Sequence, residues 1–392
     1  MFALLLALIY LAFISLGLSD SLLGAGWPVM QADMNVPLSF AGILTMIIAG
    51  GTIVSSLMSD RLTKRIGAAP VIAFGVLFMA VALLGFSFSR AFWMLCVFAI
   101  PYGLGAGTVD AALNNYVALR YASRHMNWMH CFWGVGASIS PYVMSFCLTN
   151  GSGWSGGYRT VGCIQVALTA VMFLSLPLWK KQGARAADKQ TRAPAMKLSQ
   201  IMKIRGVNLI MPAFLGYCAV EATTGLWASS YLVLHRGINP EIAARYASFF
   251  FLGITGGRFI SGFISDRIGN RKMIRLGIAI AITGIIAVWA PVSADWLCLN
   301  GLVVIGLGCA PIFPAIIHET PANFGEENSQ AIVGVQMASA YTGTTLMPPL
   351  FGLIADNISI SLYPYFLMVF ALLMLFILEK LNKTVSRSLA QE

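Results

Sequence analysis

Long apolar runs separated by short polar breaks extend along nearly the whole chain. Each run holds roughly 20 residues, enough for an α-helix to cross the ~30 Å hydrocarbon core of a bilayer. The pattern therefore predicts twelve transmembrane helices. The first six are expected at residues 3–30, 38–58, 68–88, 92–120, 127–149 and 158–179, and the second six at residues 207–234, 242–264, 272–291, 296–318, 329–352 and 360–379.

The only long polar segment, residues 180–200, lies between the sixth and seventh runs. We predict an N-terminal six-helix bundle at residues 1–180, a basic cytoplasmic linker at 181–205, and a C-terminal six-helix bundle with a short cytoplasmic tail at 206–392. The expected fold class is an all-α polytopic membrane protein. The apolar N-terminus lacks a basic leader and a small-residue cleavage site, so it is expected to remain as the first span.

Composition leaves little room for a soluble domain. Of the 392 residues, 58% are hydrophobic and 10% are charged, whereas soluble domains carry about 25% charged residues. The seven cysteines form no CxxC pair and no metal-ligand spacing, which argues against a disulfide framework or a zinc site. HExxH, GxSxG and nucleotide-loop motifs are absent as well, so we expect neither an enzyme nor a cofactor.

The net charge of +10 is distributed unevenly across the predicted membrane. With a cytoplasmic N-terminus, only Arg90, Arg159, Arg236 and Arg245 fall on the far side, and Arg258 lies inside a span. All other Lys and Arg residues fall in cytoplasmic loops or the tail, as the positive-inside rule requires. We therefore predict a multi-pass protein of the inner (plasma) membrane with both termini in the cytoplasm. The expected partners are lipid and a small solute, not nucleic acid, and we expect a monomer.

The two halves carry similar polar segments six spans apart. After span two the chain reads SSLMSDRLTKRIG (Ser55–Gly67), and after span eight it reads GRFISGFISDRIGNRKM (Gly257–Met273). Both place an Asp-Arg pair between a small-residue helix face and a glycine turn, and parallel repeats of this kind mark secondary transporters. Asp266 is expected to hold a neighbouring helix N-terminus or Arg258. The residues predicted to form conformational gate loops are Asp60, Arg61, Arg258, Asp266, Arg267 and Arg271.

The second of these segments meets the pattern GxxxDRxGxRK in full, through Gly262, Asp266, Arg267, Gly269, Arg271 and Lys272. This pattern resembles the signature loop of the major facilitator superfamily, although the first copy departs from it at Ser56 and Thr63. The resemblance covers essentially the whole chain. It implies the major facilitator fold, in which two pseudo-symmetric six-helix bundles form one transporter.

Four segments resemble the fucose permease and sodium-glucose transporter branch of that superfamily. They are SDSLLGAGWP (Ser19–Pro28), VDAALNNYV (Val109–Val117), MNWMHCFWGVGASISP (Met126–Pro141) and TGTTLMPPLFGLIADN (Thr342–Asn357). In the fucose permease branch, a span-one Asp and a span-four carboxylate followed four residues later by Asn govern proton coupling and sugar binding. The resemblance therefore implies such roles for Asp20, Asp110 and Asn114. His130 stands where a Gln is common and Asn115 replaces a usual Pro, so the solute need not be fucose.

Polar residues inside the spans are costly in hydrocarbon and therefore mark a candidate site. Asp110 and Asn114 share one helix face at i and i+4. A carboxyl group there can take up a proton and pass through the closed state in its neutral form, and the same oxygens can instead bind sodium. We expect proton coupling, with sodium as the alternative coupling ion. A helix-packing network with Asn115 and Asn127 is the structural alternative.

Three further stretches present polar or aromatic faces. Span one aligns Asp20 with Trp27 and Gln31, and Pro28 is expected to kink it. Asn127 and His130 share a face at i and i+3, and His130 can titrate or donate a hydrogen bond to the solute. In the second half, Tyr217 and Glu221 lie on one stripe, which suits sugar recognition. The predicted solute-binding residues are Trp27, Gln31, Asn114, Asn115, Asn127, His130, Trp133, Tyr217, Glu221, Trp227 and Gln336.

These features predict a secondary active transporter that imports a small polar solute, expected to be a sugar, together with protons by alternating access. Asp20 and Asp110 are the expected coupling residues, and the cavity is expected near the membrane midplane between the halves. The alternatives within transport are a sodium-coupled sugar symporter and a proton-driven exporter of drugs or amphiphiles. A non-transporting receptor and an intramembrane enzyme are the alternatives from other classes.

Overall fold

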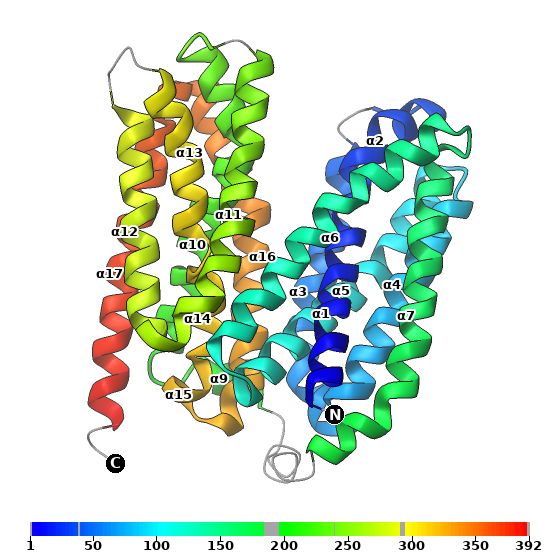
Figure 1. The fold of residues 1–392 in the computed structure, drawn as a ribbon, viewed down its shortest axis with the longest axis vertical. Coiled ribbons are helices and arrows are strands. Elements are labelled where there is room, and N and C mark those ends of the chain that lie inside the picture. Colours follow the sequence, from blue (N-terminus) through cyan, green and yellow to red (C-terminus); the bar gives the residue numbers. More distant parts are fainter. Residues whose placement is uncertain (1, 38–39, 184–195, 239, 291–294, 390–392) are drawn as a thin grey trace. The chain divides into compact units, whose positions relative to one another are not determined.

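The computed structural model describes residues 2–37, 40–183, 196–238, 240–290 and 295–389. Within these ranges every regular element is a helix (Figure 1). Residues 184–195, about half of the predicted linker, lie outside the described residues. A single short helix, α9 (Leu198–Ile201), lies in the part of the linker that is described.

The helices of the first half closely follow the predicted spans. They are α1 (Phe2–Asp20), α2 (Leu22–Asp33), α3 (Phe40–Ile66), α4 (Ala68–Phe88), α5 (Phe92–Arg120), α6 (Ser123–Thr149) and α7 (Gly153–Gly183). The second half contains α10 (Val207–Leu234), α11 (Pro240–Ile268), α12 (Asn270–Trp289), α13 (Asp295–Cys309), α14 (Ile312–His318), α15 (Thr320–Phe324), α16 (Glu326–Asn357), a single 3₁₀ turn η1 (Ile360–Leu362) and α17 (Tyr363–Leu389).

Ten helical stretches of the described chain are long and apolar enough to cross a membrane. The two remaining predicted spans correspond to α11 and α16, which are 29 and 32 residues long. The first half of α16 carries Glu326, Glu327 and Gln330, which lowers its hydropathy without shortening the helix. The helices therefore provide twelve passes, as the apolar runs predict.

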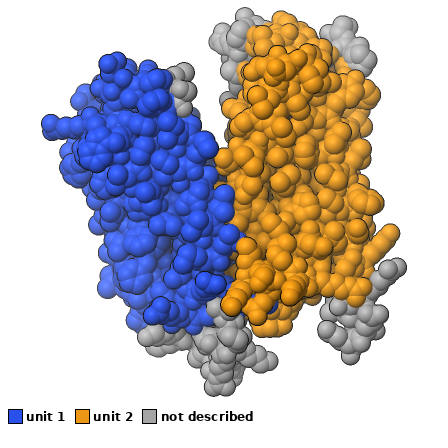
Figure 2. All heavy atoms as spheres, turned by 180° about the vertical axis from the view of Figure 1, so that it is seen from behind, with its two compact units in different colours: residues 1–116, 129–196 blue, residues 117–128, 197–392 orange. Residues whose placement is uncertain are grey.

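Contacts divide the chain into two compact units, which Figure 2 colours separately. The first unit holds residues 1–116 and 129–196, and the second holds residues 117–128 and 197–392. The end of α5 and the start of α6 thus group with the helices of the second half. Within the first unit, α4 packs along α7, and within the second, α12 packs along α13 and α10 packs along α16.

Span one is broken at Ser21, one residue after Asp20. The Ser21 hydroxyl lies 3.2 Å from the Gly17 carbonyl on its own helix and donates at 2.9 Å to the Ala137 carbonyl of α6. A serine hydroxyl that bonds to backbone in this way competes with the regular helix ladder. Pro28, where a kink is predicted, lies inside α2, so the helix continues through it. The break places the Asp20 side chain at the end of a helix.

The Asp-Arg pairs lie in helices, so the expectation that they form loops is wrong. Asp60 and Arg61 belong to the last turns of α3, and Asp266 and Arg267 belong to the last turns of α11. In both copies the helix extends past the predicted end of the span, to Ile66 in α3 and to Ile268 in α11. The polar repeat is therefore held on rigid helix ends.

Both of these helices end at a glycine with positive φ. Gly67 has φ +87° and Gly269 has φ +82°, a backbone region that favours glycine because it lacks a Cβ. The Gly67 N–H donates to the Thr63 carbonyl at 2.8 Å, and the Gly269 N–H donates to the Ser265 carbonyl at 2.8 Å. The same turn geometry in both halves agrees with the sequence repeat.

Glycines also set equivalent helix crossings in the two halves. A Cβ at Gly103 of α5 would lie 2.2 Å from the Ile48 carbonyl oxygen of α3. A Cβ at Gly306 of α13 would lie 2.2 Å from the Phe250 carbonyl oxygen of α11. The backbones of spans two and four are therefore in close contact, and so are those of spans eight and ten. Small residues such as glycine allow helices to approach this closely.

Alanine at Gly103 or Gly306 should push these helices apart and destabilise the protein by about 1–3 kcal/mol, the usual cost of overpacking. The measurement is thermal unfolding of the purified variants in detergent. Gly50→Ala in α3 and Gly256→Ala in α11 are matched controls, because nothing lies within 4 Å of a Cβ at either position. An equal loss of stability in all four variants would show that the crossings do not depend on glycine.

Candidate functional site

Asp20 accepts two hydrogen bonds at the break in span one. The Tyr102 hydroxyl of α5 donates to Oδ1 at 2.8 Å, and the Trp133 indole N–H of α6 donates to Oδ2 at 2.9 Å. Asp20 itself is exposed on the surface of the first unit. An exposed carboxylate within a membrane span is tolerated where it faces water and not lipid. We name this group the Asp20 cluster: Asp20, Tyr102 and Trp133.

A second polar group lies on α5 and α6, the two helices that also carry Tyr102 and Trp133. We name it the Asp110 cluster: Asp110, Asn114 and His130. The Asn114 amide nitrogen donates to Asp110 Oδ1 at 2.7 Å, and His130 Nε2 lies 2.9 Å from Asn114 Oδ1. Because the Asn114 nitrogen is already a donor to Asp110, its oxygen is the acceptor, and His130 carries its hydrogen on Nε2. Asn114 is 0% exposed and His130 is 6% exposed, whereas Asp110 is partly exposed.

The two clusters follow the same pair of helices. Tyr102 and Asp110 are eight residues apart on α5, which is about 12 Å at the rise of an α-helix. His130 and Trp133 are three residues apart on α6 and therefore share a face. Trp133 of α6 thus bonds directly to Asp20, whereas His130 of α6 bonds to Asn114, which in turn bonds to Asp110. Tyr102 lies in the polar stretch of span four. Because Tyr102 and Asp20 belong to different helices, helical spacing along the sequence could not predict that they bond to each other.

The remaining predicted residues of the first unit have structural surroundings. Trp27 is 4% exposed and packs its ring edge on Phe92 at 6.3 Å. Gln31 is partly exposed on α2, one helix turn beyond Trp27. Asn115 is 2% exposed within α5.

Sequence reasoning missed Gln165 of α7. Its side chain is 0% exposed, and its amide nitrogen donates at 2.9 Å to the Ser19 hydroxyl and at 3.2 Å to the Ser15 carbonyl. These bonds fix the end of α1 immediately before Asp20. A lone Gln in an apolar run is the only signal that the sequence offers for it.

In the second unit, the structure brings Glu221 of α10 to Arg258 of α11. An Arg258 guanidinium nitrogen lies 3.3 Å from Glu221 Oε1, with side-chain exposures of 7% and 26%. Tyr217, one turn before Glu221, is 1% exposed and packs against the Phe313 ring at 5.6 Å. Arg258 was predicted among the gate residues, but its partner is the predicted solute-binding carboxylate. A charge pair inside a span satisfies both groups where water is scarce.

Trp227 and Gln336 contact other parts of the second unit. The Trp227 indole N–H donates to the Pro348 carbonyl at 2.9 Å, and its ring packs on Phe351 at 5.7 Å. Gln336 is 0% exposed and exchanges hydrogen bonds with the Thr320 hydroxyl at 2.8 and 3.1 Å. The structure therefore does not bring Gln336 into the Glu221 pair.

The second copy of the repeat lies in a polar network within the second unit. Asp266 accepts from the Arg124 backbone N–H at 3.1 Å and from its guanidinium at 3.3 Å. Arg124 is the second residue of α6, so Asp266 holds a helix N-terminus, one of its two expected partners. Arg271 donates to Glu319 at 2.9 Å and to Asn323 at 3.0 Å. Arg267 is exposed.

Asn270 and His318 extend this network. The Asn270 amide nitrogen lies 3.0 Å from His318 Nδ1 and 3.0 Å from Glu319 Oε2, and His318 Nε2 lies 2.7 Å from the Tyr121 carbonyl oxygen. Asn127, predicted to line the solute site, instead donates to the Ser123 carbonyl at 3.1 Å and groups with the second unit.

The first copy of the repeat is held by polar contacts of Asp60. Asp60 is 2% exposed and accepts from Lys64 at 3.1 Å and from the Met196 backbone N–H at 3.3 Å. Arg61, its neighbour in the motif, is exposed. No three His, Cys, Asp or Glu side chains among the described residues come together as a metal site would require.

Two of the relatives that this chain matches are transport proteins. It is 24% identical over 316 residues to the glucose/mannose transporter of Bacillus subtilis, covering 78% of this chain and 77% of that protein. It is 23% identical to the cis,cis-muconate transport protein of Acinetobacter baylyi, covering 90% and 87%. The match to the bypass of stop codon protein 6 of Saccharomyces cerevisiae is 23% identical and covers 65% of this chain, but only 56% of the yeast protein.

Solved structures share the fold. The structure of the E. coli fucose:proton symporter matches with a TM-score of 0.75 at 17% identity, covering 95% of this chain and 98% of that one. A proton:xylose symporter matches with a TM-score of 0.76 at 11% identity, covering 97% and 95%. These likenesses confirm the predicted twelve-helix architecture.

The family assignment rests on the sequence itself. The family model of the Major Facilitator Superfamily matches residues 9–317 and, in a second match, residues 228–390. Together these matches span nearly the whole chain, and members of the family are transporters, not enzymes. The chain belongs to the major facilitator superfamily and is a multi-pass membrane transporter of a small-molecule solute.

Proposed function

We propose that this transporter imports a sugar together with protons by alternating access. The observation that carries the proposal is the pair of carboxylates in the first unit, Asp20 and Asp110. Asp20 accepts a hydrogen bond from Trp133 of α6, and Asp110 accepts one from Asn114, whose own oxygen accepts from His130 of α6. A carboxyl group inside a membrane can bind a proton and become neutral for passage through the closed state.

The comparisons support the sugar as the solute class. One relative is a glucose/mannose transporter, and two proteins of the same fold are fucose and xylose symporters that use protons. The Asp110 cluster offers both donors and acceptors, which suits hydroxyl groups. Trp133, on the neighbouring turn of α6, provides an aromatic edge beside Asp20.

The test is uptake into proteoliposomes with an imposed pH gradient. The solute panel is D-glucose, D-mannose, L-fucose, D-xylose and cis,cis-muconate, each with a radioactive label. We expect one of the sugars to accumulate when the outside is acidic. One pH unit corresponds to 1.36 kcal/mol and therefore supports roughly tenfold accumulation of a neutral solute with one proton.

The same vesicles separate the alternatives. Accumulation driven by a sodium gradient at equal pH inside and outside would identify sodium as the coupling ion. Drug extrusion from vesicles without sugar uptake would identify an exporter. Accumulation of muconate without accumulation of any sugar would overturn the proposal that the solute is a sugar, and would retain the proposal that the protein imports its solute.

A further inference from the structure

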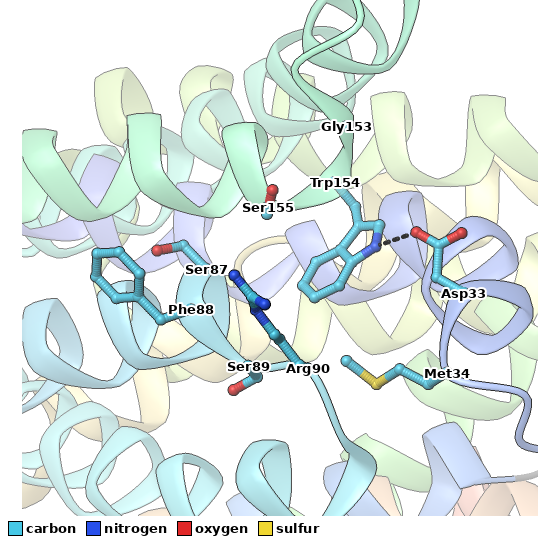
Figure 3. A pocket seen from close by; sticks show the side chains of 9 residues that line it. All are labelled: Asp33, Met34, Ser87, Phe88, Ser89, Arg90, Gly153, Trp154 and Ser155. Atoms are coloured by element: carbon cyan, nitrogen blue, oxygen red, sulfur yellow. Dashed lines mark hydrogen bonds between the residues drawn. The ribbon is translucent and has the colours of Figure 1, made fainter.

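The first unit contains a cavity that neither polar cluster occupies. Its volume is about 410 Å³, and it lies where α2 ends, where α4 gives way to α5, and where α7 begins (Figure 3). Small-molecule pockets usually span about 300–1,000 Å³, so this cavity is large enough for a monosaccharide. The predicted topology places all three of these helix ends on the side of the membrane opposite the cytoplasm.

Opposite charges line this cavity from different elements. Asp33, the last residue of α2, accepts the Trp154 indole N–H on Oδ2 at 2.7 Å. Arg90, in the connection between α4 and α5, is exposed and extends its guanidinium toward Trp154 and Ser155 in Figure 3. The guanidinium makes no hydrogen bond or ion pair with any residue that the structure describes. Arg90 therefore offers free donors to a ligand.

Hydroxyl and apolar groups complete the wall. The Ser87 hydroxyl donates to the Leu84 carbonyl at 2.7 Å, which leaves its oxygen lone pairs available as acceptors. Phe88 is 67% exposed and also lines the cavity. Donors, acceptors and an apolar surface together suit a sugar, whose hydroxyls both donate and accept and whose ring carries an apolar face.

The charge balance distinguishes a neutral sugar from an anion. Arg90 contributes one positive charge and Asp33 one negative charge, so the cavity as a whole is neutral. A carboxylate or phosphate would gain from Arg90 but be repelled by Asp33. A neutral polyhydroxy compound can bond to both without that repulsion.

We propose that this cavity is an outer capture site for the transported sugar, built from Asp33, Ser87, Arg90 and Trp154. The site is separate from the Asp20 and Asp110 clusters and holds the solute before it enters the transport pathway. This inference rests on the proposed import of a sugar.

The experiment measures protection of an introduced cysteine. Ser155→Cys places a thiol in the cavity wall, in a chain whose exposed Cys163 is replaced by Ser. A membrane-impermeant maleimide is added outside intact proteoliposomes with each sugar of the panel. At about ten times its Kd, a sugar that binds in the cavity should slow labelling roughly tenfold, because only about a tenth of the sites stay free.

Two further variants test the chemistry. Adding Arg90→Ala should raise the sugar concentration for half-protection about tenfold or more, the expected loss of a charge-assisted hydrogen bond. Thr149→Cys, an exposed position at the end of α6 outside the cavity lining, is the control and should label at the same rate with or without sugar. Protection should persist when Asp110→Asn is introduced, because Asp110 is not part of the cavity.

The outcomes separate the two proposals. Unchanged labelling of Ser155→Cys in the presence of a sugar that the same vesicles accumulate would overturn the capture site and leave sugar import intact. Protection by a sugar when no sugar of the panel is accumulated would show that the cavity binds sugar, but it would overturn sugar import and, with it, the capture of a transported sugar. Neither protection nor accumulation by any sugar of the panel would overturn both.

Discussion

Replacing Asp110 by Asn is expected to abolish gradient-driven accumulation of the solute while sparing much of its binding and exchange. Asparagine has nearly the same shape and keeps an oxygen that can accept a hydrogen bond from the Asn114 amide nitrogen, which lies 2.7 Å from Asp110 Oδ1. It cannot take up a proton. Under a gradient of one pH unit, the wild-type protein should accumulate solute roughly tenfold, and the variant should stop at equal concentrations inside and outside.

The measurement pairs two assays on the same proteoliposomes. Accumulation under a pH gradient reports coupling, and counterflow of labelled against unlabelled solute reports binding and movement without net proton transfer. Asn115→Ala is a useful comparison, since Asn115 is 2% exposed on the same helix and its amide does not titrate. Undiminished accumulation by Asp110→Asn would exclude Asp110 as the coupling residue.

Replacing Glu221 by Ala should destabilise the protein, because Arg258 would keep its positive charge in a nearly buried position. The Arg258 side chain is 7% exposed and its guanidinium lies 3.3 Å from Glu221. Removing one partner of a buried pair costs about 3–5 kcal/mol, and we expect the lower end because Glu221 is 26% exposed. Thermal unfolding in detergent should shift down by several degrees.

The matched control is the double variant Glu221→Ala, Arg258→Met. It removes both charges and fills the space of the arginine stem, so most of the lost stability should return. Glu221→Gln should lie between the wild-type protein and Glu221→Ala, because its amide oxygen can still accept from Arg258. A double variant as unstable as Glu221→Ala alone would show that the charge of Arg258 is not the cause.

Some contacts in the site could be predicted from the sequence because the residues share one helix. Asp110 and Asn114 are four residues apart, so a helix must place them on one face, and the structure joins them by a hydrogen bond. His130 was predicted as a site residue, but its bond to Asn114 crosses from α6 to α5. Helical spacing orders residues along one helix and contains no information about which neighbouring helix they meet.

Other assignments depended on which side chains meet between different helices. Arg258 looked like part of a gate from its place beside the repeat, yet its partner is Glu221, 37 residues earlier. Gln336 looked available to a solute, yet its amide bonds only to Thr320 in a buried position. Tyr102 reaches Asp20 across 82 residues of sequence. Each of these pairs meets because two helices cross at a particular height.

By itself, the sequence determined that the chain crosses a membrane twelve times in two related halves, because apolar length and the placement of basic residues are local properties. It also determined which polar residues are too costly to face lipid. Only the tertiary structure decided how they are satisfied. It showed the break of span one at Ser21, the Asp-Arg pairs on helix ends, and the bonds from α6 to Asp20 and to Asn114, the partner of Asp110. These features follow from helix crossings, which depend on close contacts between residues distant in the chain.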